Sequence, residues 1–223
     1  HRYRGFMEGA IIGVERGTTG VAPPRKALRE TGYAFNISNG SRTLFQGNDG
    51  ATGLGDISFY GKYQILKETS SLPALSVRVG VKAPTGDTGE VFGSGHPDAG
   101  IGLALDKKFA DNWILYANLN GVFPTGRIAG LGLQPVVSGL VAVEYLWTEN
   151  FSITAQFDYY SPPFHGTGTR VLDKGVTESV LGVSYRILPG LLWQLYGVEN
   201  LDFITGSAAD FTLSTVLTYR FRS

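Results

Sequence analysis

The feature that most constrains the fold is a regular alternation of short and long connections between strand-like segments. From Gly55 onward, nine segments of roughly 10–14 residues have the character of β-strands. The connections are short at 68–72, 110–112, 148–150 and 188–190, and long and rich in Gly and Pro at 84–95, 124–135, 162–175 and 202–208. Short turns at one end and long loops at the other are typical of a transmembrane up-and-down β-barrel, whose tilted strands need about 9–11 residues to cross a bilayer.

Several segments place apolar and polar residues on opposite faces. In residues 55–67, Ile57, Phe59, Tyr63 and Ile65 oppose Ser58, Tyr60, Lys62 and Gln64. The same period-2 alternation marks residues 75–82, 151–159 and 211–221, and a weaker form marks 97–109, 136–147 and 176–187. Residues 190–201 mix the two faces, so the alternation does not orient them.

Two architectures satisfy this pattern, because a soluble sandwich or barrel buries the apolar face and a membrane barrel turns it to lipid. Aromatic residues favour the membrane barrel because they gather at both strand ends, as interfacial girdles do. Those beside the short turns are Phe109, Trp113, Tyr145, Trp147, Phe151, Tyr185 and Trp193; those near the long loops are Phe123, Tyr159, Tyr160 and Phe203.

The first 54 residues are irregular and rich in loops. Segments 31–38 and 42–46, joined by Asn39-Gly40, predict a hairpin, because Asn-Gly favours the primed turns that match strand twist. One arm would be a tenth membrane strand and the other part of an extracellular loop. Bacterial barrels have even strand numbers, so we expect ten strands, or twelve if an N-terminal pair is missing. We expect a single domain over 1–223, with its nine clear strands in 55–222.

Composition narrows the functional classes. The formal net charge of +0 argues against a nucleic-acid partner. Charged residues make up 17% of the chain, below the roughly 25% of an average soluble domain. The absence of Cys excludes disulfides and cysteine metal sites. No run approaches 18 apolar residues, so no transmembrane helix is expected. The residues after His1 show no apolar export core of a signal peptide, and a mature outer-membrane protein would have lost that segment.

A specific resemblance begins at Gly53-Leu54-Gly55-Asp56-Ile57, followed by Lys62-Tyr63, by Val81-Lys82-Ala83-Pro84-Thr85-Gly86-Asp87 and by Gly93-Ser94-Gly95. This series resembles the domain of unknown function 3187 family of outer-membrane proteins. It is also similar to the broader family named for the MetA pathway of phenol degradation. Glu199-Asn200 and Ala209-Asp210-Phe211-Thr212 fit the first family too, so the resemblance covers roughly residues 50–222.

The resemblance implies a bacterial outer-membrane β-barrel and carries over no catalytic residues. The phenol-degradation name implies transport of small hydrophobic or aromatic compounds. The Pro-Thr-Gly-Asp run also has a structural explanation, because Pro ends the strand ladder and Gly-Asp turns the chain into a loop.

The polar faces of the strands supply ten residues predicted to line a lumen: Lys62, Arg78, Lys82, Asp106, Lys108, Glu144, Asp158, Glu178, Arg186 and Arg220. Because both signs are present, no single-sign ring selects anions or cations. Such charges can pair across a narrow lumen and plug it, or they can line a polar pore. A transporter of hydrophobic molecules would need an apolar mouth, for which the loop residues Phe92, Ile128, Leu131, Leu133 and Phe164 are candidates.

An outer-membrane hydrolase is the competing class, since His96 and His165 lie in long loops and a catalytic base needs a neighbouring Ser or carboxylate. Ser94 and Asp98 flank His96, but closeness in sequence does not make a triad. Asn48, Asp49 and Asp56 offer oxygen ligands for calcium, without EF-hand spacing. We therefore expect no enzyme activity, cofactor or metal. The expected partners are outer-membrane lipid, small hydrophobic or polar solutes, and other envelope proteins contacted through the loops.

Overall fold

The computed structural model describes residues 35–39, 41–47, 53–88, 92–128, 131–168, 170–201 and 211–221. The chain divides into two compact units, His1–Thr52 and Gly53–Ser223, and each is described by itself. This boundary lies close to the predicted change at residue 54; the prediction of one domain stays a prediction.

The first unit contains the predicted hairpin. Strand β1 (Phe35–Asn39) pairs antiparallel with β2 (Arg42–Gly47). Asn39 is paired with Arg42 and belongs to β1, so the strand extends one position beyond the predicted segment 31–38. Within the described residues β1 and β2 form a sheet of their own, and neither arm is seen as the predicted tenth strand of the large sheet.

The second unit contains all nine predicted strands in one antiparallel sheet. They are β3 (Ile57–Leu66), β4 (Ala74–Ala83), β5 (Asp98–Ala110), β6 (Trp113–Pro124), β9 (Val136–Leu146), β10 (Phe151–Tyr160), β11 (Val176–Leu188), β12 (Leu191–Asn200) and β13 (Phe211–Tyr219). Their order is β13-β12-β11-β10-β9-β6-β5-β4-β3, an up-and-down meander in which chain neighbours are sheet neighbours. The all-β, antiparallel prediction is confirmed.

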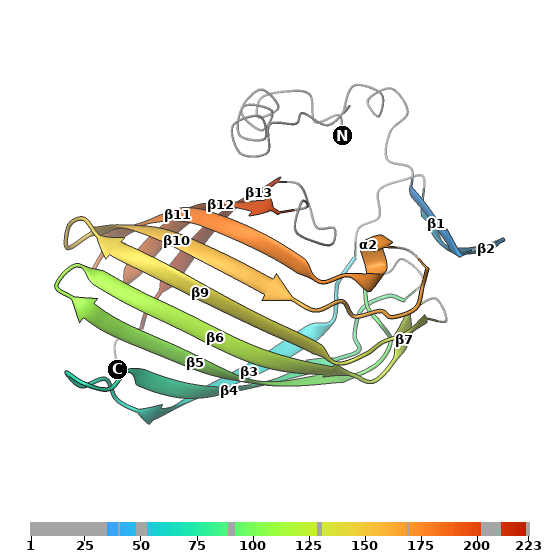
Figure 1. The fold of residues 1–223 in the computed structure, drawn as a ribbon, viewed down its shortest axis with the longest axis horizontal. Helices are drawn as coiled ribbons and strands as arrows, with labels where there is room; N and C mark the ends of the chain where they lie inside the picture. Colours follow the sequence, from blue (N-terminus) through green and yellow to red (C-terminus); the bar gives the residue numbers. More distant parts are fainter. Residues whose placement is uncertain are drawn as a thin grey trace, which may run out of the picture. The chain divides into compact units, whose positions relative to one another are not determined.

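Short turns and long loops separate to opposite ends of the sheet, as the alternation predicts. The two-residue strands β7 (Arg127–Ile128) and β8 (Leu131–Gly132) lie in the connection between β6 and β9, and the helix α2 (Arg170–Asp173) lies between β10 and β11. Figure 1 shows β7 and α2 at one end of the slanting strands and the β5–β6 and β9–β10 turns at the other. We call these the loop end and the turn end.

The sheet is open in the part of the chain that the structure describes. Strands β3 and β13 each have one described partner, β4 and β12, and form its two edges. The described strands of this sheet number nine, an odd count, so neither the ten nor the twelve strands expected from the sequence is observed.

The two faces of the sheet differ in chemistry, and the distribution of burial is inverted relative to a soluble protein. Buried apolar side chains in the described residues are limited to Ala74, Ala104, Ala142 and Val176, whereas Ser76, Ser152, Thr167, Ser184, Glu199 and Asn200 are buried polar residues. Thirty large hydrophobic side chains of the described residues are exposed, among them Phe157 at 62% and Leu217 at 66%. Water-soluble proteins bury these residue types first.

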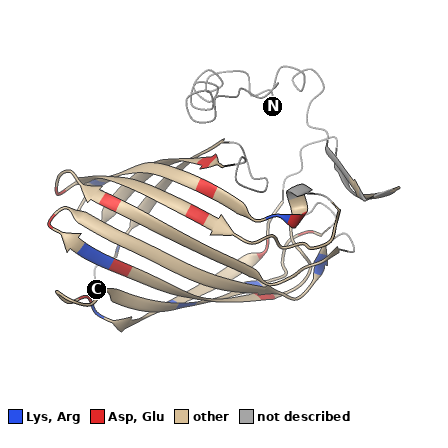
Figure 2. Cartoon of the chain, in the orientation of Figure 1, with Lys and Arg blue, Asp and Glu red and all other residues tan. Residues whose placement is uncertain are grey.

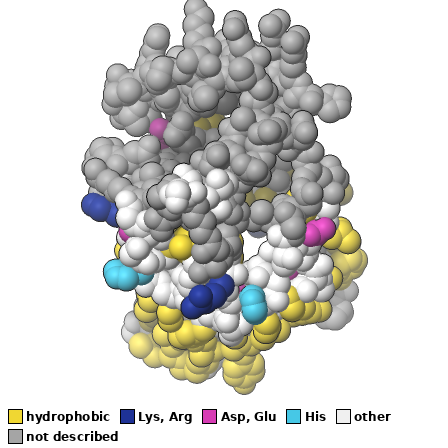
Figure 3. Space-filling model, turned by 90° about the vertical axis from the view of Figure 1, so that its right-hand side faces the viewer, with side chains coloured by type: hydrophobic (Ala, Val, Ile, Leu, Met, Phe, Trp, Pro, Cys, Tyr) yellow, Lys and Arg dark blue, Asp and Glu magenta, His cyan; other side chains and the backbone are white. Residues whose placement is uncertain are grey.

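Figure 2 shows how few charged residues the strands carry, and in Figure 3, seen from the loop end, hydrophobic side chains cover the visible flank of the sheet. We call the face that carries Phe157 and Leu181 the apolar face, and the face that carries Arg78, Asn120 and Glu144 the polar face. In β4, β5, β9 and β10 the polar-face positions are mostly less exposed than the apolar-face positions, which indicates a sheet that curves with its polar face concave.

Aromatic side chains of the apolar face meet in a chain at the turn end. The ring centroids of Phe109 and Trp113 are 6.3 Å apart, those of Trp113 and Tyr145 4.8 Å, and those of Tyr145 and Trp147 6.2 Å. Tyr185 stands directly opposite both Phe151 and Trp193 and extends the row across β10, β11 and β12. The predicted clustering at the turn end is therefore present; of the residues predicted for the loop end, Phe203 lies outside the described residues.

Among the described residues, no helix has the length and apolar character needed to span a membrane.

Candidate functional site

Nine of the ten charged residues predicted to line a lumen share the polar face. Directly opposite residues in antiparallel strands point to the same side, so the register assigns each of them. The nine are Lys62, Arg78, Lys82, Asp106, Lys108, Glu144, Asp158, Glu178 and Arg186. Arg220 follows the end of β13, is exposed, and donates its backbone N–H to the Gly190 carbonyl at 2.7 Å. That the polar face lines a lumen stays a prediction.

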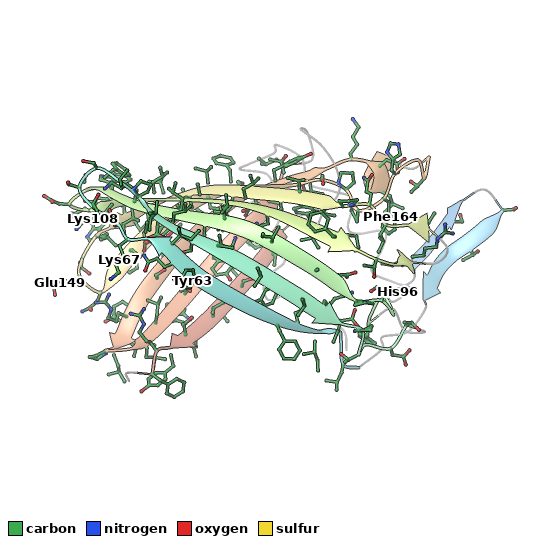
Figure 4. The ribbon with its side chains drawn as sticks, turned by 90° about the horizontal axis from the view of Figure 1, so that it is seen from below. Tyr63, Lys67, His96, Lys108, Glu149 and Phe164 are labelled. Carbon is green, nitrogen blue, oxygen red and sulfur yellow. The ribbon has the colours of Figure 1, made fainter. Side chains whose placement is uncertain are left out.

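Figure 4 shows how far apart the ends of this face lie, with Lys67, Lys108 and Glu149 at the turn end and His96 and Phe164 at the loop end. Two pairs of like-charged residues lie on this face. Lys62 and Arg78 stand directly opposite each other on β3 and β4, and Asp158 and Glu178 do so on β10 and β11. Among the ion pairs of the described residues, none joins two of the ten predicted lumen residues.

A hydrogen-bonded row crosses the polar face from β4 to β9. Arg78 donates from Nη2 to Asn120 Oδ1 at 2.7 Å, and Asn120 donates from Nδ2 to Ser138 Oγ at 3.2 Å. Gly102 lies between Arg78 and Asn120 in the register, and a Cβ at this position would be 2.2 Å from Asn120 Oδ1. The bond between the two side chains therefore requires glycine on the intervening strand.

Glu144 is fixed by two hydroxyl groups closer to the turn end. Tyr116 donates from its hydroxyl to Oε2 at 2.6 Å, and the buried Ser152 donates to Oε1. These bonds hold the carboxylate of Glu144 in one orientation on the polar face, where it is a hydrogen-bond acceptor with no ion-pair partner among the described residues.

Asp158 and Glu178 form an acidic pair next to a buried amide. The register continues from Asp158 through Glu178 to Asn200, which is 2% exposed. Gln156 donates from Nε2 to Asp158 Oδ2 at 2.8 Å. The amide oxygen and nitrogen of Asn200 are both buried without a hydrogen-bond partner. The sequence predicts the two acids on this face but not Asn200, because the pattern of residues 190–201 does not assign their faces.

At the loop end, Lys82 joins the carboxylates of Asp56 and Asp98, which the sequence suggests for two unrelated sites. Its Nζ lies 2.7 Å from Asp56 Oδ2 and 2.7 Å from Asp98 Oδ2, and donates to Ser94 Oγ at 2.6 Å. The Asp56 side chain is only 8% exposed. Hydrogen bonds from Lys82 and from the Gly86 N–H lower the pKa of the Asp56 carboxyl from 3.8 to about 2. We call Asp56, Lys82, Ser94 and Asp98 the loop anchor.

The loop anchor explains the motif residues around it. Asp56 accepts the N–H groups of Gly86 and Ser94 at 2.9 and 3.2 Å, and Thr85 Oγ1 accepts the N–H of Ile57 at 2.9 Å. A Cβ at Gly93 would be 2.4 Å from Asp56 Oδ1, and one at Gly86 would be 2.6 Å from the Phe92 carbonyl oxygen. The Pro-Thr-Gly-Asp run therefore has a structural role: its residues attach the first long loop to the ends of the strands.

The apolar loop candidates pack against neighbouring loop segments. The ring of Phe92 covers Gly53, where a Cβ would be 2.8 Å away. Phe164 belongs to a junction between two loops, because Gln134 donates from Nε2 to the carbonyls of Pro162 at 2.9 Å and Phe164 at 3.1 Å. Ile128 and Leu131 face each other in the β7–β8 hairpin. The described loops are tied to one another and to the strand ends.

The apolar face also carries a shallow groove of about 490 Å³. It lies where Ala117 and Gly139 leave space between larger side chains such as Leu103 and Phe157. Its lining is overwhelmingly apolar, so the groove fits hydrocarbon rather than a polar ligand.

The predicted histidines do not assemble a triad. Ser94 Oγ accepts from Lys82 and donates to the backbone carbonyl of His96 at 3.1 Å, and the imidazole of His96 packs on Gly126. His165 lies near Asp173, whose carboxyl pKa is lowered mainly by the Thr167 N–H at 3.0 Å and further by this histidine. Ser94 and Asp98 therefore serve the loop anchor rather than His96.

The residues predicted as calcium ligands do not form a calcium site in the described residues either. Asp56 pairs with Lys82, which occupies the position that a cation would take. Asn48 and Asp49 lie outside the described residues. In the part of the chain that is described, no group of three or more His, Cys, Asp or Glu residues is arranged to hold a metal ion.

Comparison with known proteins gives a family match. No curated protein matches the chain. A family model described as "Protein of unknown function (DUF3187)" matches residues 32–221, which includes the β1–β2 hairpin as well as every strand of the large sheet. The match starts earlier than the resemblance over residues 50–222 indicated. It covers most of the sequence, and the chain therefore belongs to the DUF3187 family of proteins of unknown function.

Proposed function

We propose that the protein is a bacterial outer-membrane β-barrel that gives small molecules a passive path across the membrane. The observation that carries this proposal is the inverted burial: thirty large hydrophobic side chains of the described residues are exposed, while polar groups fill the crowded face. Lipid is the solvent that suits such a surface, and tilted strands of 9–13 residues are long enough to cross it. The aromatic row at the turn end supports one interfacial girdle.

The charges of the polar face favour a path for polar as well as apolar solutes. In a closed barrel of ten strands, each strand lies across the lumen from the strand five places further along the sheet. Strand β3 would therefore lie opposite β10, and β4 opposite β11. Lys62 and Arg78 would then face Asp158 and Glu178 across the lumen, and the field between them would orient dipolar solutes.

A plugged barrel that serves as a structural or partner-binding envelope component is the second candidate. Two polar networks favour it: the Arg78–Asn120–Ser138 row and the loop anchor both extend over the polar face toward the loop end. Hydrogen-bonded networks of this kind can close a narrow lumen. A hydrolase has no comparable support, because the groups around His96 are engaged elsewhere.

Single-channel conductance of the refolded protein in a planar bilayer separates the two candidates. We expect reproducible stepwise openings, and Arg78→Ala, which removes a lumen charge and opens the polar row, should change both conductance and ion selectivity. Lys67→Ala removes the same charge at the turn end and is the matched control. A silent bilayer, with a heat-modifiable folded band on a gel, would support the plugged barrel and overturn the channel.

A further inference from the structure

Among the described residues, the acidic pair on the polar face has no ion-pair partner, and the buried amide beside it has no hydrogen-bond partner. Asp158 and Glu178 are directly opposite each other, with Cβ atoms typically 4.5–5.5 Å apart in such pairs. The ion pairs of the described residues involve Lys82 and Lys107, and neither acid takes part in one. Two like charges directly opposite each other destabilise the sheet, and a cation between or beside them relieves this repulsion.

Asn200 supplies the independent observation. Its side chain is 2% exposed, it follows Glu178 in the same register row, and neither of its amide atoms has a hydrogen-bond partner. A buried amide oxygen without a partner destabilises the fold, so its presence beside two carboxylates indicates a ligand that uses it. The N–H of Leu201, bonded to the Thr177 carbonyl at 2.9 Å, holds this end of β12 against β11.

We propose that Asp158, Glu178 and Asn200 form a binding site for a hydrated divalent cation on the polar face. Two carboxylates and an amide oxygen are the hard ligands that Ca²⁺ and Mg²⁺ prefer, and water completes the coordination shell. The cation offsets the repulsion between Asp158 and Glu178 and gives the Asn200 oxygen a partner. The inference rests on the proposed function only in that the polar face must be reachable from water.

Isothermal titration of the detergent-folded, chelator-treated protein with CaCl₂ and with MgCl₂ tests the site. We expect saturable binding of one cation, with a dissociation constant of about 10⁻⁴–10⁻³ M, the range of calcium sites in extracellular modules. Asp158→Asn and Glu178→Gln should each weaken binding at least tenfold, and Asn200→Ala should weaken it as well. Glu149→Gln removes the same charge at the turn end and should leave the affinity unchanged.

A second measurement guards against variants that merely fold poorly. Ca²⁺ should raise the urea midpoint of the wild-type protein and of Glu149→Gln but not that of Glu178→Gln, while all three remain heat-modifiable on a gel. Three results would overturn the proposal: no saturable binding up to about 10 mM, an equal loss in Glu149→Gln, or binding of putrescine without binding of Ca²⁺. Because binding is measured without a membrane gradient, a silent bilayer does not affect the outcome.

Discussion

Gly102 shows at the scale of one residue how the polar face is organised. It has no Cβ, and Arg78 therefore reaches across β5 to Asn120 on β6. Arg78 Nε is already buried without a partner, so this guanidinium depends on the Asn120 bond more than an exposed one would. Gly102 therefore makes the Arg78–Asn120 hydrogen bond possible without taking part in it.

Gly102→Ala should break the bond between Arg78 and Asn120, because the new Cβ would occupy the position of Asn120 Oδ1. We expect the free energy of unfolding to fall by about 1–3 kcal/mol, the range for leaving a buried polar group unpaired. Urea unfolding of the folded protein in lipid vesicles, followed by tryptophan fluorescence, measures the change. Gly121→Ala is the control, since its nearest contact is an ordinary 3.5 Å to the Phe123 ring; an equal loss there would contradict the assigned role.

The loop anchor should open in acid. The pKa of Asp56 is lowered from 3.8 to about 2 in the folded state, so its stabilising effect is complete above about pH 4 and is lost as the pH falls through 2. The amides of Gly86 and Ser94, which donate to Asp56, should lose hydrogen-exchange protection across this window.

The Ser161 amide, bonded to the Val137 carbonyl in another connection, is the internal control and should stay protected. Asp56→Asn should remove the pH dependence of the Gly86 and Ser94 amides. Protection factors that stay constant in the wild-type protein from pH 4 to 2 would contradict this assignment.

At the scale of one strand, β10 presents Phe157 and Gln156 to opposite faces, and the two positions should respond oppositely to the same charge. Phe157→Arg should destabilise the protein in lipid by about 2–4 kcal/mol, the cost of a cation near the midplane of a lipid face. Gln156→Arg should cost much less, because the new charge lies beside Asp158 on the polar face. Vesicle-based unfolding compares them, and equal effects would contradict the assigned faces.

The strands also show what periodicity can and cannot predict. Most bounds fall within a few residues of the predicted segments, because alternation continues to the strand ends and Gly or Pro marks the loops. The face of β12 was not predictable, since Leu192 and Leu195 put leucines on both faces and only pairing with β11 and β13 orients them. The loop anchor was missed for a related reason: Asp56 and Asp98 are 42 positions apart, and only tertiary structure brings both to Lys82.

At the scale of the whole molecule, the open edges of the sheet give the last prediction. Both faces of β3 are exposed along its whole length, and β13 has only β12 beside it in the described residues. Unpaired backbone groups cost several kcal/mol each in hydrocarbon, so an inserted sheet cannot keep free edges. In lipid, we expect β3 and β13 to be paired on both sides, directly or through a further strand.

Residue-resolved hydrogen exchange of the protein in lipid nanodiscs tests this closure. The amides of β3 and β13 that point away from β4 and β12 should be as strongly protected as those in the centre of β10. If these outward amides exchange as fast as the amides of the 84–97 loop, the sheet stays open. The proposal of a closed barrel would then be wrong, even if the strands contact lipid. If the outward amides are protected in lipid but not in a short-chain detergent, the bilayer is what drives the edges to pair. The reason is that unpaired backbone groups are most unfavourable in the hydrocarbon of a bilayer.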